Sequence, residues 1–139
     1  MDGQDHKSLA LWAADCAERV LPRFEEERPG DNRPRRAVEA GRAWARGEIK
    51  MSAARTAAFD AHAAAREADR AEAEAAARAA GHVAATAHVA THAPHAAAYA
   101  VKAAARTAGS TNPSSVATEE RDWQHRHLPE HLRSMAFPT

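Results

Sequence analysis

Alanine is the feature that most limits what this chain can fold into, because 39 of its 139 residues are alanine. Alanine has the highest helix propensity, but each buried alanine removes little apolar area from water. This composition favours long helices whose backbones approach closely, with a few large residues that hold the helices in place. We expect these large core residues to be Leu9, Trp12, Val20, Leu21, Phe24, Trp44, Phe59, Tyr99 and Trp123.

The fold class follows from the same pattern. No segment shows the period-two alternation or the β-branched runs that are typical of strands. The length fits one domain with one core. We therefore predict an all-α, alanine-rich, single-domain bundle of four to five helices over residues 1–139, with a flexible N-terminus at 1–7, a linker at 109–117 and a flexible tail at 134–139.

Capping and breaking residues predict where the helices begin and end. Ser8 caps a first helix to about residue 21, where Pro22 ends or kinks it. Asp31 or Asn32 caps a second helix that ends at Gly47. A third helix runs from about 53 to 80, and Gly81 breaks it. A fourth runs from about 82 to 107 with a proline in its middle, and a short last helix follows the linker.

Charge and cysteine content restrict the class of protein. Lys and Arg together number 19, as do Asp and Glu. The chain therefore lacks the basic surplus that is typical of a nucleic-acid binder. Cys16 is the one cysteine and fits a reducing compartment. The N-terminal segment does not resemble a secretory signal, and no window is apolar enough for a membrane span. We expect a cytoplasmic protein with no membrane or nucleic-acid partner.

Histidines recur at helical spacing in the predicted fourth helix. His88, His92, His95 and Tyr99 step by four, three and four residues, which places them on one stripe of a helix. Histidines at i and i+4, such as His88 and His92, can share a metal ion, but a site would need a third ligand such as His62 or Asp15. The glutamate of a zinc-protease HExxH motif is absent.

Phe59, His62 and Arg66 form a second stripe on the predicted third helix. This stripe favours a structural role for the histidines of both helices. Antiparallel packing of the two helices would set one stripe against the other, in a polar seam whose members hydrogen-bond to one another because unpaired buried polar groups are costly. A metal site and a pH-sensitive seam remain as alternatives. The seam would consist of Phe59, His62, Arg66, His88, His92, His95 and Tyr99.

Arginines gather at the start of the predicted second helix, at Arg33, Arg35 and Arg36. Their simplest role is structural, in ion pairs with Asp15, Glu18 or Glu25 of the first helix. The alternative is recognition of a partner through the bidentate guanidinium group. Trp123 is also ambiguous, because it lies beyond the linker.

Nothing in the sequence resembles a catalytic nucleophile with its base. Cys16 lies on the apolar side of the first helix with carboxylates nearby, which disfavours the reactive thiolate. The serines cluster in the linker, and paired carboxylates occur only within helical charge runs. We expect neither catalysis nor a cofactor.

Three segments carry a resemblance to a known family: WAADCAERVLP, DNRPRRAVEA and RAWARGE. Together with the later alanine-rich helices and WQHRHLPEHLR, they resemble the immunity-five-like family of immunity proteins. The resemblance implies an all-helical protein that protects its host by stoichiometric binding of a protein toxin. Arginine and tryptophan are common anchors of interfaces, so Arg33, Arg35, Arg36 and Trp123 are our candidate partner-binding residues. The rival hypothesis is a helical metal-binding protein that uses His88, His92 and His62.

Overall fold

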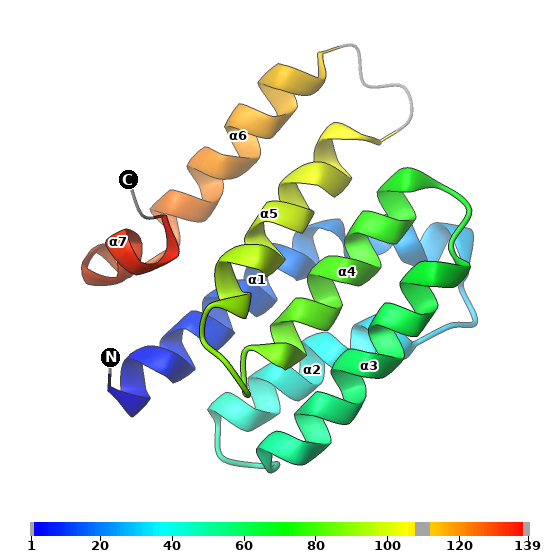
Figure 1. Cartoon of the computed structure of the whole chain (residues 1–139). Coiled ribbons are helices and arrows are strands. Elements are labelled where there is room, and N and C mark those ends of the chain that lie inside the picture. Colours follow the sequence, from blue (N-terminus) through cyan, green and yellow to red (C-terminus); the bar gives the residue numbers. More distant parts are fainter. Residues whose placement is uncertain (1, 108–111, 138–139) are drawn as a thin grey trace.

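The computed structural model describes residues 2–107 and 112–137, and within these ranges every regular element is a helix (Figure 1). The all-α prediction is confirmed, but four to five helices was too few for the described part of the chain. The elements are α1 (Gly3–Glu27), α2 (Arg33–Ala45), α3 (Met51–Glu67), α4 (Ala71–Ala85), α5 (His92–Ala105), α6 (Pro113–Arg126), the 3-10 helix η1 (Glu130–Leu132) and α7 (Arg133–Ala136).

Helix α4 is the centre of the bundle, since it packs against α1, α2, α3 and α5 (Figure 1). Helices α2 and α3 lie on one side of it. Helix α6 packs on α5, at the opposite side of the molecule, with α7 at its end. No helix in the described ranges has the length and apolar character that a membrane crossing requires.

Most of the buried apolar side chains are alanine, as the composition predicted. The larger buried residues include Leu9, Trp12, Val20, Leu21 and Phe24, all on α1. The expectation of a core position was wrong for Phe59, which is 61% exposed on α3. The other expected aromatic core residues, Trp44, Tyr99 and Trp123, are only half-buried.

Helix α1 is longer at both ends than the predicted helix. It begins at Gly3, where the Asp2 carboxylate accepts a hydrogen bond from the Asp5 N–H at 2.8 Å, so residues 3–7 are helical and Ser8 is not the cap. Pro22 lies inside the helix without ending it, and α1 continues to Glu27. One missing N–H is tolerated because the flanking turns bury Val20, Leu21 and Phe24.

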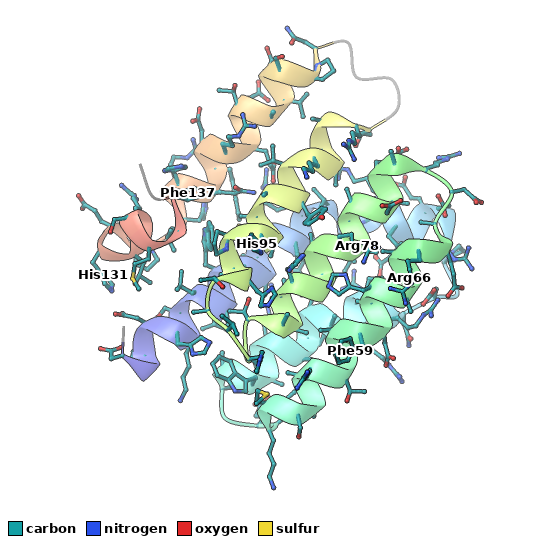
Figure 2. The ribbon with its side chains drawn as sticks, in the orientation of Figure 1. Phe59, Arg66, Arg78, His95, His131 and Phe137 are labelled. Atoms are coloured by element: carbon teal, nitrogen blue, oxygen red, sulfur yellow. The ribbon has the colours of Figure 1, made fainter. Side chains whose placement is uncertain are left out.

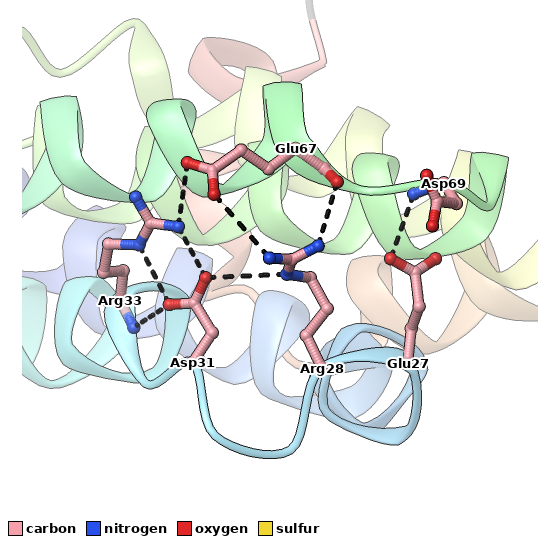
Figure 3. Close-up of polar contacts among 6 residues, drawn as sticks. All are labelled: Glu27, Arg28, Asp31, Arg33, Glu67 and Asp69. Atoms are coloured by element: carbon pink, nitrogen blue, oxygen red, sulfur yellow. Dashed lines mark hydrogen bonds and ion pairs between the residues drawn. The ribbon is translucent and has the colours of Figure 1, made fainter.

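The predicted helix over 53–80 is two helices, α3 and α4, with a break at residues 68–70. A side chain from α1 stabilises this break. The Glu27 carboxylate accepts hydrogen bonds from the N–H groups of Asp69 at 3.0 Å and Arg70 at 2.7 Å (Figure 3 shows the contact with Asp69). Unpaired N–H groups at a helix start favour a carboxylate, so Glu27 helps to set where α4 begins.

Two further breaking residues have other roles than predicted. Gly81 lies inside α4, where an added Cβ would stand 2.6 Å from Nε2 of His62, so the glycine makes room for that ring. Pro94 lies in the first turn of α5, where no backbone N–H is required. The predicted helix over 82–107 is therefore wrong, because α4 ends at Ala85 and α5 begins at His92.

Residues 108–111, which include part of the predicted linker, lie outside the described residues, as do 138–139 of the predicted tail. Residues 113–117 of that linker form the start of α6, capped by the Asn112 side chain. In the tail, residues 134–136 belong to α7, and the Phe137 ring meets the Trp12 ring edge-on with centroids 5.6 Å apart.

Buried polar contacts hold α6 against α1 and α5. The Trp12 indole N–H donates to the Gln124 carbonyl at 2.9 Å, and the Gln124 side-chain amide donates to the Ala97 carbonyl at 2.8 Å. One turn earlier on α6, near its middle, Glu120 accepts two hydrogen bonds from Arg19. A chain of side chains thus joins three helices at the C-terminal side of the bundle.

Candidate functional site

Four imidazoles from three helices meet at one place, which we call the histidine cluster: His62 of α3, His82 of α4, and His92 and His95 of α5. His82 is central, with ring centroids 5.0 Å from His62, 5.2 Å from His92 and 5.4 Å from His95. The Tyr99 ring stacks on His82 at 5.3 Å, with 13° between the planes. The end of α4, the start of α5 and the middle of α3 therefore supply one aromatic, nitrogen-rich cluster.

Hydrogen bonds fix the role of His62 within the cluster. The Arg78 guanidinium donates to His62 Nδ1 at 3.1 Å. Arginine only donates, so Nδ1 is the acceptor and the proton of the neutral ring lies on Nε2. Nε2 of His62 lies against Gly81, at the position that the Cβ of any other residue would take. Both nitrogens of His62 are therefore occupied, one by Arg78 and the other by close packing.

The two neighbouring histidines face each other directly. His82 Nδ1 and His92 Nδ1 lie 3.0 Å apart, so in the neutral pair one nitrogen donates and the other accepts. The rings are close to parallel, with 27° between their planes. His95, one helical turn after His92, is exposed and meets both rings edge-on.

Burial keeps His62, His82 and His92 neutral near pH 7. It lowers the pKa of His62 to about 4, helped by the positive charges of Arg78 and Arg66. It lowers the pKa of His82 to about 3, helped by His62 and His92. The pKa of His92 is lowered too, again mainly by burial. Neutral imidazoles carry a free lone pair, so these three rings are in the protonation state that binds metal ions.

The structure brings together four of the seven residues of the predicted seam: His62, His92, His95 and Tyr99. The single stripe that included His88 is broken, because His88 lies exposed in the turn between α4 and α5. The remaining two, Phe59 and Arg66, are exposed on α3 (Figure 2).

Sequence reasoning missed His82, the central member of the cluster. The signal that could have found it is Pro94, which is typical of a helix's first turn. A helix starting near His92 implies a reversal before it, and that reversal sets the end of α4 against the start of α5.

A pocket of about 240 Å³ adjoins the cluster. Phe59 is an exposed aromatic residue at this pocket, and the Arg55 guanidinium lies 5.6 Å from the centre of the Phe59 ring. We call this the Phe59 pocket; it is lined by Arg55, Ala58, Phe59, His62, Ala85, His88 and His92. An exposed aromatic ring beside a pocket is a feature that partner proteins use.

Arg33, at the start of α2, takes part in a network of internal ion pairs (Figure 3). Arg33 donates to both oxygens of Asp31, at 2.9 and 2.6 Å, and to Glu67 at 3.1 Å. The hydrogen bonds from Arg33 hold the pKa of the Asp31 carboxyl below its usual range. Arg28 also pairs with Glu67, at 3.7 Å. This network joins the ends of α1 and α3 to the start of α2.

The other candidate partner-binding residues differ in how far their side chains are engaged. Arg35 binds Glu25 of α1 through two hydrogen bonds, at 2.6 and 2.8 Å. Arg36 is exposed. The Trp123 ring is half-buried, with His127 stacked on it at 4.0 Å and the Arg19 guanidinium 4.1 Å from its centre.

Cys16 is buried, and its surroundings oppose the thiolate. Burial raises the pKa of its thiol far above the usual range, and the carboxylates of Asp15 and Glu120 raise it further. A thiol in this environment is a packing residue rather than a nucleophile.

The fold and its sites therefore define a small all-helical protein with a network of ion pairs at its helix ends, the Phe59 pocket and the histidine cluster. Residues 1–131 match the family described as Imm-5 like putative immunity protein, so the chain belongs to this family. This confirms the resemblance seen in the sequence. A search of curated proteins and a search of solved structures each returned no significant match.

Proposed function

We propose that this protein neutralises a partner toxin in the cytoplasm by stoichiometric binding, without catalysis of its own. Membership of an immunity-protein family carries the proposal. The geometry supports it, because a bundle with a network of ion pairs at its helix ends presents side chains on rigid elements. Rigid elements lose little conformational freedom on association, which favours tight binding.

The Phe59 pocket is the surface that we propose as the centre of the toxin interface. Phe59 is 61% exposed, and a large aromatic group gains most from burial against a partner. Arg55 beside it can pair with an acidic group on the toxin. Binding over this surface would block the toxin by occluding its active site or its substrate path.

A second candidate surface consists of Arg33, Arg35, Arg36 and Trp123. Arg36 is the exposed member of this set. The internal partners of Arg33 and Arg35 favour a structural role for both, so an interface there would rely on Arg36 and on the edge of Trp123. We keep this surface as the alternative that the same experiment tests.

The experiment is co-expression with each candidate toxin encoded in the neighbourhood of this gene, with survival and pull-down as the two measurements. We expect Phe59→Ala to weaken toxin binding by about tenfold or more, the loss typical of an interface anchor. Met135→Ala, which truncates another exposed apolar residue (38% exposed), is the matched control and should bind normally. Each variant must keep the helicity and melting temperature of the parent.

The two surfaces give different outcomes. Protection that survives Phe59→Ala and Arg55→Ala but is lost in Arg36→Ala or Trp123→Ala would move the interface to the second surface. Protection that is lost in none of the four would refute both. If the purified protein binds no toxin from its own gene neighbourhood, the proposed function itself fails.

A further inference from the structure

We propose that His82, His92 and His95 bind one divalent transition-metal ion, with zinc as the best fit. One ring nitrogen from each lies within 4.8 Å of the other two. In a tetrahedral zinc site with Zn–N bonds of about 2.0–2.1 Å, ligand nitrogens stand about 3.4 Å apart. His82 Nδ1 and His92 Nδ1, at 3.0 Å, are already close to this spacing. On metal binding, the rings of His82 and His92 would exchange their mutual hydrogen bond for bonds to the ion, and the exposed ring of His95 would move inward.

The backbone presents these three residues from helix ends that are held in place. His92 and His95 are one turn apart on α5, so their side chains share a face. His82 lies in the last turn of α4, whose end is fixed by the buried Thr86: its hydroxyl donates to the His82 carbonyl at 2.8 Å. A site built on two packed helix ends loses little freedom when the metal binds.

The donor set selects the type of metal. Three imidazole nitrogens and no carboxylate favour zinc, copper, nickel or cobalt over magnesium or calcium, which prefer oxygen. The same set distinguishes this site from one built on His62 and His88. His62 is unsuitable because Arg78 occupies Nδ1 and Gly81 packs against Nε2. Its role is to support the ring of His82 edge-on, with centroids 5.0 Å apart.

The geometry also leaves one coordination position open. Three protein ligands would occupy three corners of a tetrahedron, and the exposure of His95 gives solvent access to the site. Water or a small anion would complete the coordination, as in zinc sites with three protein ligands. The proposal does not depend on toxin binding, since it concerns this chain alone.

The test uses the full-length protein after treatment with a chelator. Zinc is titrated in competition with a chromophoric chelator, and cobalt is titrated with detection of its visible absorption. We expect one equivalent of zinc per chain and a tetrahedral cobalt spectrum. His95→Ala should weaken zinc binding more than tenfold; its exposed side chain makes this variant the safest for folding. His88→Ala, from the neighbouring turn, is the matched control and should bind as the parent does.

The melting temperature gives a second measurement. Zinc should raise it in the parent and in His88→Ala, but not in His95→Ala, because only a bound folded state gains stability. Absence of saturable zinc binding in the parent would overturn the proposal. Equal affinity in the parent and His95→Ala would overturn it as well, and so would a loss in His88→Ala as large as in His95→Ala. None of these outcomes bears on toxin binding, so the two proposals can fail separately.

Discussion

Gly81 and His62 form a pair whose energetic coupling can be worked out from the structure. In Gly81→Ala, the new Cβ would stand 2.6, 2.7 and 2.9 Å from three atoms of the His62 ring. The ring cannot move away freely, because Arg78 holds its Nδ1 at 3.1 Å and His82 lies on its other side. Overpacking of this kind costs about 1–3 kcal/mol, whereas Gly→Ala in a helix interior contributes about 1 kcal/mol of stability.

The net expectation is a loss of roughly 1 kcal/mol of unfolding free energy in Gly81→Ala. The change in unfolding free energy caused by Gly81→Ala should reverse its sign when His62 is absent. In the His62→Ala background the space is open, so adding Gly81→Ala should stabilise by up to about 1 kcal/mol through helix propensity. The difference between the two backgrounds, about 2 kcal/mol, is a coupling energy typical of residues in contact.

Urea unfolding followed by far-UV circular dichroism measures all four proteins of this cycle. Gly3→Ala is the control for an unobstructed helical glycine, because nothing lies within 4 Å of its added Cβ. Gly81→Ala that stabilises the parent as much as it stabilises His62→Ala would refute the argument that Gly81 makes room for the ring.

Three further outcomes follow from contacts described above. The free energy of unfolding should fall by on the order of 2 kcal/mol as the pH drops from about 6.5 toward 4, because lowered histidine pKa values mean that the unfolded chain binds more protons in this window. Urea midpoints at several pH values measure this fall. His82→Gln should reduce it, and a variant whose midpoint falls with pH as much as the parent's would contradict the prediction. Glu27→Ala should lower the free energy of unfolding by about 1 kcal/mol, because the start of α4 loses its cap. Glu26→Ala, at the exposed neighbouring position, is the control and should lower it little. Equal effects of the two variants in thermal melts would show that the cap contributes nothing. Cys16 should resist thiol reagents until the protein unfolds, and rapid labelling of the native protein would disprove its burial.

Local signals predicted the helical class but not the positions where the helices end. Alanine content and the absence of strand periodicity were sufficient for the class. The break at residues 68–70 contains neither glycine nor proline, and its cap comes from Glu27, more than forty residues earlier in the chain. Such a cap depends on tertiary contact, so no window around the break could reveal it.

The candidate site shows the same division. The spacing of His92, His95 and Tyr99 correctly placed them together on one helix. Extending that helix back to His88 was wrong, because Gly81 was interpreted as a break between helices and Pro94 was placed in the middle of one. Here Gly81 serves packing and Pro94 serves a helix start. The role of Gly81 depends on how α3 packs against α4, which no local window shows, whereas Pro94 could have indicated the start of α5.

The alanine core has a consequence for how this protein can change over generations. Where helices approach on alanine, any larger side chain would force them apart, so positions such as Ala61, Ala76 and Ala100, all with no exposed surface, accept little variation. Outward positions such as Phe59 carry no part of that constraint. Sequence change is therefore directed to the exterior, where the proposed toxin-binding surface can vary while the interior stays the same.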